Sequence, residues 1–253
     1  MKQKRTLALR PDPGGAVPET AMVMAAGLGK RMRPLTATRP KPLVEVGGRT
    51  LIDHVFDRLR AAGVRRVVVN VHYLADALEA HLKNRVEGLE ITVSDERGRL
   101  METGGGLVQA RDLLGDKPFL VVNSDNLWID GPADAIRLLA KRWDDDTMDA
   151  LLLVVPLARA HNHSGQGDFH VAPDGRITGR RKAGKPAPFV YTGVQILSPR
   201  VLRDWPEGPF STMVFWERAI AEGRAYGLVH QGLWFDVGTP KAIGVTEAIL
   251  ADG

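Results

Sequence analysis

Apolar positions in the first 155 residues alternate between strand-like and helix-like spacing. Short apolar runs, typical of buried strands, occupy 21–26, 66–71, 89–93, 119–122 and 150–155. Stretches with apolar residues at helical spacing lie at 51–62, 73–84, 104–114 and 133–143. Thr50 and Gly63 are suited to begin and end the first of these helices. The alternation predicts an α/β fold of the Rossmann-like kind, with a mixed, mainly parallel sheet flanked by helices.

The pattern changes from about residue 156. Pro173-Asp174-Gly175 separates two short strands at 169–171 and 176–178, which is a hairpin signal. The elements predicted after it are strands at 189–197, 225–229 and 233–237, a helix at 212–222 and a last helix from Thr239. We expect a smaller antiparallel part inserted over the sheet edge. The prediction is a single domain over 21–253, with halves at about 21–155 and 156–253, after a flexible extension at 1–20 that is rich in proline and glycine.

The composition excludes several classes of protein. With 44% hydrophobic and 25% charged residues, the chain is neither disordered nor collagen-like. The net charge of +4 is small for a protein that binds nucleic acid. No apolar run reaches the roughly 18 residues of a membrane span, and residues 1–20 lack the apolar segment of a signal peptide. The absence of cysteine excludes disulfides and thiolate zinc sites. We expect a cytoplasmic protein, either a monomer or a small homo-oligomer.

A basic loop that contains glycine follows the first predicted strand. Residues 27–42 carry five cations and three prolines but no acidic residue, and prolines at this density exclude a helix. Glycines let backbone N–H groups approach phosphate oxygens, and arginine and lysine bind the same anion. The dinucleotide fingerprint needs glycine where Met32 stands, and the Walker loop has a different spacing. We interpret the segment as another kind of phosphate-binding loop. The alternative is a basic surface loop.

Two aspartates follow predicted strands that are far apart in the sequence. Asp125 comes just after the strand at 119–122, and Asp236 lies near the end of the strand at 233–237. Ligands of parallel sheets bind beyond the carboxyl ends of the strands, so the loops after the strands ending at residues 26, 93 and 122 should meet at one edge. The two carboxylates could complete a Mg²⁺ site there. Taken alone, Asp125 could equally be a helix cap and Asp236 a turn residue.

Two glycine-rich segments add further candidates. Glu102-Thr103-Gly104-Gly105-Gly106 precedes a predicted helix and would allow close approach of a flat ring or a phosphate, although a flexible turn is an equally simple interpretation. Residues 161–170 include three histidines, but their spacing matches no standard zinc site. A loop that shapes a sugar pocket is the better interpretation of this segment.

The segment A-A-G-L-G-K-R-M-R-P-L-T at 25–36, followed by Pro40-Lys41-Pro42, resembles the signature of the sugar-1-phosphate nucleotidyltransferases. The resemblance covers about 21–250 and implies the nucleotide-diphospho-sugar transferase fold, with a nucleotide-binding first half and a sugar-binding second half. It implies that a nucleoside triphosphate and a sugar 1-phosphate give a nucleotide sugar and pyrophosphate. The β-helical tail of larger relatives is absent, so a second activity is not expected.

The resemblance also implies roles for individual residues. The catalytic residues would be Arg31, Lys41, Asp125 and Asp236, and the two aspartates would bind Mg²⁺. The nucleotide would be bound by Ala25, Ala26, Gly27, Gly29, Lys30, Arg31, Glu102, Thr103, Gly104 and Asn123. Gly167 and Gly193 would shape the sugar pocket. Many members hold the sugar phosphate with a Glu-Lys pair, which this sequence lacks; the nearest cations are Arg180, Arg181, Lys182 and Lys185.

Four shorter segments resemble those of family members that use UTP and N-acetylmuramate 1-phosphate, in the recycling of cell-wall sugars, and so imply these substrates. They are M-E-T-G-G-G, N-S-D-N, G-Q-G-D-F and W-F-D-V-G-T, at 101–106, 123–126, 165–169 and 234–239. The alternatives are GTP with mannose 1-phosphate, dTTP with glucose 1-phosphate, and a non-catalytic regulatory protein that binds nucleotide sugars. The lactyl carboxylate of N-acetylmuramate requires a cation. The candidates, each of which could equally lie on a solvated face, are Arg159, Arg180, Arg181, Lys182 and Lys185.

Overall fold

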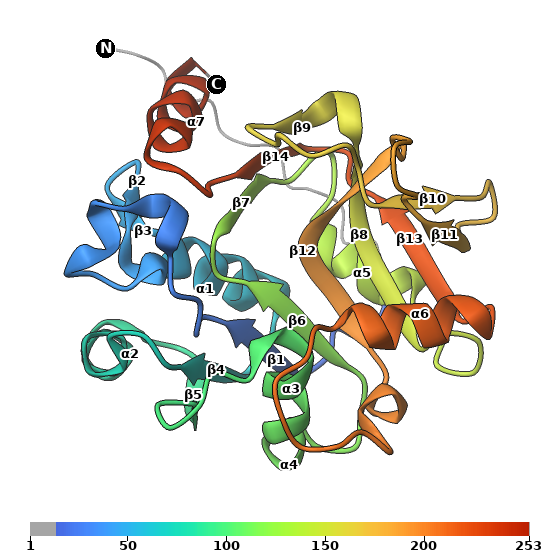
Figure 1. The fold of residues 1–253 in the computed structure, drawn as a ribbon, viewed down its shortest axis with the longest axis horizontal. Coiled ribbons are helices and arrows are strands. Elements are labelled where there is room, and N and C mark those ends of the chain that lie inside the picture. Colours follow the sequence, from blue (N-terminus) through green and yellow to red (C-terminus); the bar gives the residue numbers. More distant parts are fainter. Residues whose placement is uncertain (1–13, 253) are drawn as a thin grey trace.

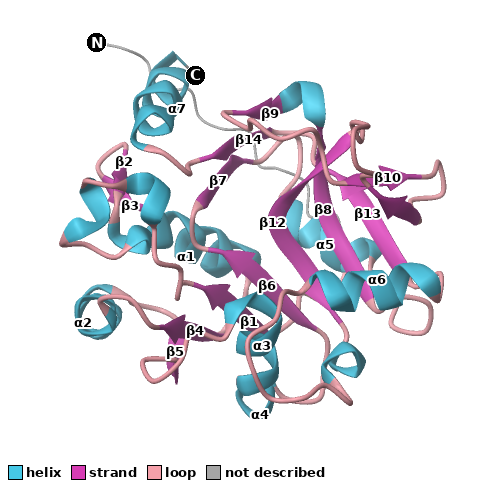
Figure 2. Ribbon diagram, viewed as in Figure 1, coloured by secondary structure: helices cyan, strands magenta, loops and turns pink. Residues whose placement is uncertain are grey.

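A nine-stranded mixed sheet lies between two layers of helices in the computed structural model, which describes residues 14–252 (Figures 1 and 2). Its strands are β1 Thr20–Met24, β4 Arg66–Val71, β5 Glu90–Asp95, β6 Phe119–Asn123, β8 Ala150–Pro156, β10 Phe169–Val171, β11 Ile177–Arg180, β12 Phe189–Leu197 and β13 Ala225–Val229. The order is β11-β10-β12-β6-β1-β4-β5, with β8 beside β12 and β13 beside β8. β1 runs parallel to both β4 and β6, which confirms the predicted parallel arrangement.

β12 joins the second half of the chain to the first. It pairs antiparallel with β6, β8 and β10, and β13 then pairs in parallel with β8. The second half therefore extends the central sheet instead of lying over its edge, because β12 takes the position beside β6. The predicted hairpin at 169–178 is present as β10 and β11.

Helices cover both faces of the sheet because alternate strand residues point to opposite sides. Ala21 and Val23 of β1 belong to the core beneath α1 (Leu51–Ala62), α2 (Ala75–Arg85) and α5 (Ala135–Arg142). Met22 belongs to the core beneath α3 (Glu102–Gln109), α4 (Arg111–Leu114) and α6 (Met213–Ala221). The Thr50 hydroxyl accepts a hydrogen bond from the third residue of α1, and Gly63 ends that helix with φ of 100°, as predicted.

A small three-stranded sheet begins near the carboxyl end of β6, after two intervening residues (Figure 1). β7 (Asn126–Ile129) pairs antiparallel with β14 (Leu233–Asp236), which pairs in parallel with β9 (Ala160–His161). α7 (Pro240–Asp252) packs on it through Ile243 and Leu250, in a third core cluster that includes Leu127 and Phe235. A two-stranded ribbon, β2 (Glu45–Val46) and β3 (Arg49–Thr50), lies in the segment that leads into α1.

Three local predictions differ from the structure. The helix predicted at 104–114 is divided at Ala110 into α3 and α4. The basic loop at 27–42 contains no α-helix but forms three single 3₁₀ turns, η1 (Lys30–Met32), η2 (Leu35–Ala37) and η3 (Lys41–Leu43). Strands β7 and β9 were not predicted. Two further 3₁₀ turns are η4 (Leu157–Arg159) and η5 (Pro199–Leu202).

Part of the predicted N-terminal extension packs against the domain. Residues 1–13 lie outside the described residues. Val17 contacts the core cluster, and the carbonyl oxygen of Glu19 accepts hydrogen bonds from the N–H groups of Arg65 and Arg66. Gly15 lies so close to α5 that a Cβ atom there would be 2.5 Å from the nitrogen of Lys141. Residues 15–19 therefore lie against the domain.

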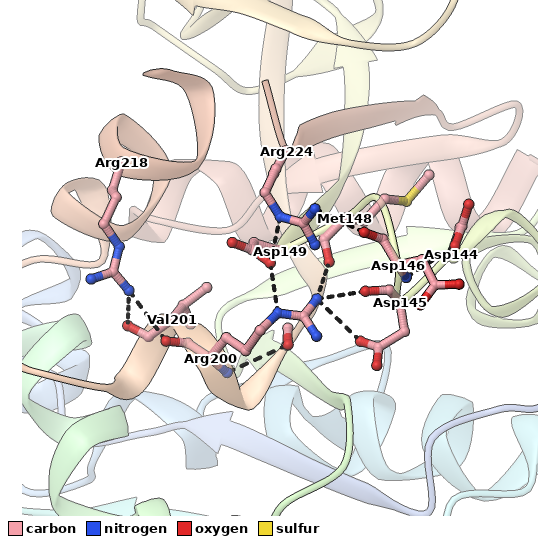
Figure 3. A network of polar contacts seen from close by, with 10 residues as sticks. Asp144, Asp145, Asp146, Met148, Asp149, Arg200, Val201, Arg218 and Arg224 are labelled. Atoms are coloured by element: carbon pink, nitrogen blue, oxygen red, sulfur yellow. Dashed lines mark hydrogen bonds and ion pairs between the residues drawn. The ribbon is translucent and has the colours of Figure 1, made fainter. Parts of the chain in front are cut away.

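A buried aspartate at the start of β8 holds several turns together (Figure 3). Asp149 Oδ1 lies 3.1 Å from Nε of Arg200 in η5 and 3.0 Å from Nε of Arg224, which precedes β13. The Arg200 guanidinium also donates to the carbonyl oxygens of Asp145 and Met148. We call these contacts of Asp149, Arg200 and Arg224 the Asp149 clasp. They join the turn before β8 to η5 and to the start of β13.

Candidate active site

A pocket of about 410 Å³ lies at the carboxyl ends of β1 and β6. The loops that follow β1, β5 and β6 all contribute to its lining, as the sequence predicted. Of the predicted site residues, those that line the pocket are Ala25, Ala26, Gly27, Lys41, Glu102, Thr103, Asn123 and Asp125. The first strand, the basic loop, the start of α3 and the segment after β6 thus meet around one space.

An ion pair connects the basic loop with the segment after β6. Lys41, in η3, donates from Nζ to Oδ2 of Asp125 at 2.6 Å. The lysine side chain is 12% exposed and the aspartate side chain 32% exposed. Partial exclusion of water strengthens the interaction of these charges with each other and with any bound anion. Pro42 is buried and anchors the turn that carries Lys41.

Asp236 reaches the same region from the small sheet. In the register of β14 and β7, it stands opposite Asn126, which directly follows Asp125. Asp125, in the turn directly before β7, is therefore next to the residue that pairs with Asp236, although the two predicted metal ligands are 111 positions apart in the sequence. Burial opposes ionisation of Asp236, but the interaction with His163 and the charges of Arg31 and Lys41 outweigh it and hold the pKa below its usual value. The carboxylate is consequently ionised at neutral pH.

Glycines make room for the cations of the basic loop. Gly29 has φ of 60°, and the Thr36 hydroxyl donates to its carbonyl oxygen at 2.8 Å, so the chain turns directly before Lys30 and Arg31. A Cβ atom on Gly238 would lie 2.8 Å from Asp236 Oδ1 and 2.9 Å from Arg31 Nη2. Arg31 therefore lies beside Asp236, and Lys41 beside Asp125.

A buried polar pair that was not predicted from the sequence borders the pocket. Asn70, at the carboxyl end of β4, accepts a hydrogen bond from the Ala25 N–H through Oδ1 at 2.6 Å. Its amide donates to Oε1 of Glu96 at 2.7 Å, and Oε2 of Glu96 accepts from the Met101 N–H at 3.0 Å. Burial raises the pKa of Glu96. This pair ties the pocket loops together, and an asparagine within a run of valines is the signal that could have revealed it.

The glycine run at 104–106 serves packing within the protein. A Cβ atom on Gly104 would lie 2.6 Å from the Phe210 ring, and one on Gly105 would lie 2.1 Å from the carbonyl oxygen of Gly208. Gly104 does not line the pocket. Glu102, which does, has φ of 57°, a strained backbone conformation for a residue other than glycine and one that is frequent at functional sites.

Of the two glycines predicted for the sugar pocket, Gly193 lies next to a residue that lines the pocket, whereas Gly167 lies next to Ala187. Gly193 of β12 has φ of 84°, and a Cβ atom there would lie 3.0 Å from Cβ of Asn123 and 2.1 Å from Nδ2 of Asn126. It therefore adjoins the pocket. Gly167 has φ of 81° and packs on the chain at Ala187, where a Cβ atom would lie 2.0 Å from the carbonyl oxygen.

The five cations near the second half fall into two groups. Arg159 donates to the carbonyl oxygens of Gln231 and Gly232, and Arg180 pairs with Glu217. The side chains of Arg181, Lys182 and Lys185 make no hydrogen bond or ion pair with any residue that the structure describes. These three lie in the exposed turn between β11 and β12.

Between residues 14 and 252, no three or more histidine, aspartate or glutamate side chains form a group that could hold a metal ion. His161, His163 and His170 thus do not assemble a zinc site. No helix in this same range is long and apolar enough to cross a membrane.

The chain resembles known proteins along almost its whole length. It matches the family model described as Nucleotidyl transferase over residues 20–252. It is 47% identical over 238 residues to N-acetylmuramate alpha-1-phosphate uridylyltransferase of Caulobacter vibrioides, which covers 93% of this chain and 98% of that protein. The protein of the same name from Neisseria meningitidis is 35% identical over 231 residues, covering 90% and 97%. Among solved structures, HddC from Yersinia pseudotuberculosis shares the fold, with a TM-score of 0.74 at 20% identity, over 92% of this chain and 99% of that chain.

Proposed function

Since this chain belongs to the nucleotidyl transferase family, which makes nucleotide sugars from nucleoside triphosphates and sugar 1-phosphates, we propose that its substrates are UTP and N-acetylmuramate 1-phosphate. The products are then UDP-N-acetylmuramate and pyrophosphate. The observation that carries this substrate choice is the 47% identity to the Caulobacter vibrioides enzyme, which extends over 98% of that protein. The cytoplasmic setting, the role in cell-wall recycling and the oligomeric state stay predictions.

The charge arrangement supports a direct attack by an oxygen of the sugar phosphate on the α-phosphorus of UTP. The nucleophile is already an anion, so no general base is needed. The main obstacle is repulsion between anions, since unit charges 4 Å apart repel by about 4 kcal/mol at an effective dielectric constant of about 20. Lys41 neutralises charge between the reacting phosphates, and Arg31 neutralises charge on the leaving pyrophosphate.

Asp125 and Asp236 are the residues that would hold Mg²⁺. One carboxylate in the turn before β7 and one at the end of the paired strand β14 fit this ion, which proteins bind through one or two carboxylates together with substrate phosphates and water. When bound, Mg²⁺ neutralises phosphate charge in the transition state. The lowered pKa of Asp236 keeps its oxygens available at neutral pH.

The first half would bind the nucleotide and the second half the sugar. Glu102 and Thr103 would contact the base and the ribose, and Gly193 would admit the sugar beside Asn123. The lactyl carboxylate of N-acetylmuramate requires a cation that is not already bonded. Among the five candidates, this favours those of the exposed turn, Arg181, Lys182 and Lys185.

A panel of four nucleoside triphosphates against N-acetylmuramate, mannose and glucose 1-phosphates, scored by pyrophosphate release with and without Mg²⁺, tests the proposal. We expect the highest kcat/KM for UTP with N-acetylmuramate 1-phosphate and no release without Mg²⁺. A preference for GTP with mannose 1-phosphate or dTTP with glucose 1-phosphate would replace the substrates. No release from any pair would indicate a binding protein.

Two variants test the metal assignment. Asp125→Asn and Asp236→Asn should each lower kcat by about 100-fold or more while the melting temperature stays close to that of the wild type, because each removes one of the two carboxylate ligands proposed for Mg²⁺. Near-normal activity of both variants would show that the carboxylates do not hold the ion.

A further inference from the structure

His163 stands beside Asp236 because of the pairing of β9 with β14. Ala160 is opposite Trp234 and His161 is opposite Phe235, so the chain that continues from β9 passes the end of β14 (Figure 1). On the other side of β14, β7 brings the Asp125 segment to the same level. Asp236 is thus flanked by the second predicted metal ligand on one side and by a histidine on the other.

The two oxygens of Asp236 face different neighbours. Oδ2 lies 3.9 Å from Nδ1 of His163, and the two side chains are only 22% and 17% exposed. Oδ1 is on the side of Gly238 and Arg31, as the clash distances for a Cβ atom on Gly238 show. The carboxylate of Asp236 therefore lies between the imidazole ring and the Arg31 guanidinium.

The imidazole ring is itself confined. It is tilted against the Trp234 ring at 6.2 Å between centroids, and a Cβ atom on Gly165 would lie 2.4 Å from its Nε2. Trp234 is fixed in turn, because its indole N–H donates to the Thr192 carbonyl oxygen at 2.8 Å. The histidine therefore has a rigid support and can act as a fixed neighbour of the carboxylate.

The proton of the neutral ring is better placed on Nδ1 than on Nε2. Nε2 is buried and has no hydrogen-bond partner among the residues that the structure describes. A buried N–H without a partner is rarer and more costly than an under-used acceptor. With the proton on Nδ1, the N–H is on the ring nitrogen that lies 3.9 Å from Oδ2 of Asp236, a distance at which its partial positive charge attracts the carboxylate without a direct hydrogen bond.

We propose that His163 is a positioning residue, which holds the Asp236 carboxylate in the orientation needed for the divalent ion. This inference rests on the proposed function, which assigns Asp236 to Mg²⁺. A site with only two protein carboxylates depends on their orientation, because the remaining ligands come from substrate and water. Groups that orient a ligand typically change metal affinity by about 10-fold to 100-fold when they are removed.

The test compares His163→Leu with His163→Asn, because asparagine can place an amide N–H near the position of Nδ1 and leucine cannot. The binding of Mn²⁺ alone is measured by loss of the free-ion electron paramagnetic resonance signal, and the Mg²⁺ activation constant is measured separately. His163→Leu should weaken Mn²⁺ binding and raise the activation constant by about 10-fold, whereas His163→Asn should stay within about twofold of wild type. The KM for UTP at saturating Mg²⁺ should not change. His161→Leu is the matched control, since His161 stacks on Phe235 and should leave the Mn²⁺ affinity unchanged.

Asp236→Asn separates failure of this inference from failure of the proposed function. If Asp236→Asn loses Mn²⁺ binding while folded His163→Leu binds as well as wild type, His163 is not a positioning residue and the metal assignment stands. If Asp236→Asn also binds Mn²⁺ normally, the metal assignment itself is wrong. Should His163→Leu not fold, His163→Gln replaces it, because its longer side chain moves the amide away from the Nδ1 position. Equal Mn²⁺ affinities of His163→Gln and His163→Asn would overturn the inference.

Discussion

Gly104 and Gly238 cannot be distinguished by residue type in the sequence, but a side chain at each position would meet different groups in the structure. A Cβ atom on Gly104 would collide with the Phe210 ring, which packs against the core cluster beneath α3, α4 and α6. A Cβ atom on Gly238 would collide with Asp236 and with the end of Arg31, which we place in the reaction. The first substitution therefore disturbs packing, whereas the second disturbs the geometry of functional groups.

Gly238→Ala should lower kcat by about 10-fold or more with little change in melting temperature. The backbone at this position has no positive φ, and the flexible end of Arg31 can move away from the new methyl group. A displacement of about 1 Å of a charged group can cost up to about 100-fold in rate. Gly244→Ala is the control, because a Cβ atom there meets nothing within 4 Å. Wild-type kcat for Gly238→Ala would show that the position of Arg31 is not critical.

At the scale of elements, the small sheet decides which groups meet. The sequence predicted the strand that ends near Asp125 and the strand that carries Asp236, and it indicated that the two carboxylates could complete one metal site. It did not predict β7 or β9, and the two residues of β9 are too few to form a periodic pattern. The pairing of β7 with β14 joins segments over 100 residues apart and leaves no local mark in the sequence. For the same reason, the link from Ala25 through Asn70 to Glu96 and the position of His163 became evident only in three dimensions.

The turn between β13 and β14 should make stability depend on pH through His230. Its Nε2 lies 3.2 Å from the carbonyl oxygens of Ile129 and Leu233. Burial, the largest influence, lowers the pKa of His230 below 6.5. The unfolded chain then binds this proton more readily than the folded chain, so the stabilisation is complete above pH 6.5 and is lost progressively as the pH falls below it.

Urea unfolding at pH 7.5 and 5.5 measures this effect. Wild type should lose more free energy of unfolding between the two pH values than His230→Gln, which cannot be protonated but retains a donor. A difference of one pKa unit corresponds to about 1.4 kcal/mol. Equal losses in the two proteins would mean that His230 does not contribute.

The Asp149 clasp should stabilise the fold without affecting the reaction (Figure 3). Asp149→Asn removes the charge that two arginine Nε groups share, and we expect a loss of about 2–3 kcal/mol, at or below the lower end of the range for a broken buried ion pair because the arginines are partly exposed. The melting temperature should fall accordingly, with kcat unchanged below it. Asp145→Asn, at the more exposed partner of Arg200, should cost less than about 1 kcal/mol. Equal melting temperatures for both variants would contradict the clasp.

At the scale of the whole molecule, one continuous sheet supports both proposed substrate regions. β12 pairs with β6, so Gly193 of the sugar half lies beside Asn123 of the nucleotide half. The proposed division near residue 155 therefore separates functions and not folding units. The resemblance of the sequence indicated the two halves, but the local pattern could not show that the antiparallel strand would be inserted next to β6.

The segment at 14–19 should contribute to the stability of the whole domain and not to catalysis. A chain that begins at Gly14 is compared with one that begins at Thr20. The shorter chain loses the contact of Val17 with the core and both hydrogen bonds that the Glu19 carbonyl accepts. Burial of one such side chain contributes about 1.5–3 kcal/mol at most, and 1 kcal/mol corresponds to about 2–4 °C in a domain of this size. The melting temperature should thus fall by several degrees.

Thr20 begins β1, while the pocket lies at the other end of this strand. The distance is roughly 16 Å at 3.3 Å per residue, so kcat and KM should not change. Equal melting temperatures of the two chains would show that residues 14–19 do not contribute to the stability of the domain. A lower kcat of the shorter chain at equal stability would show that this segment contributes to catalysis.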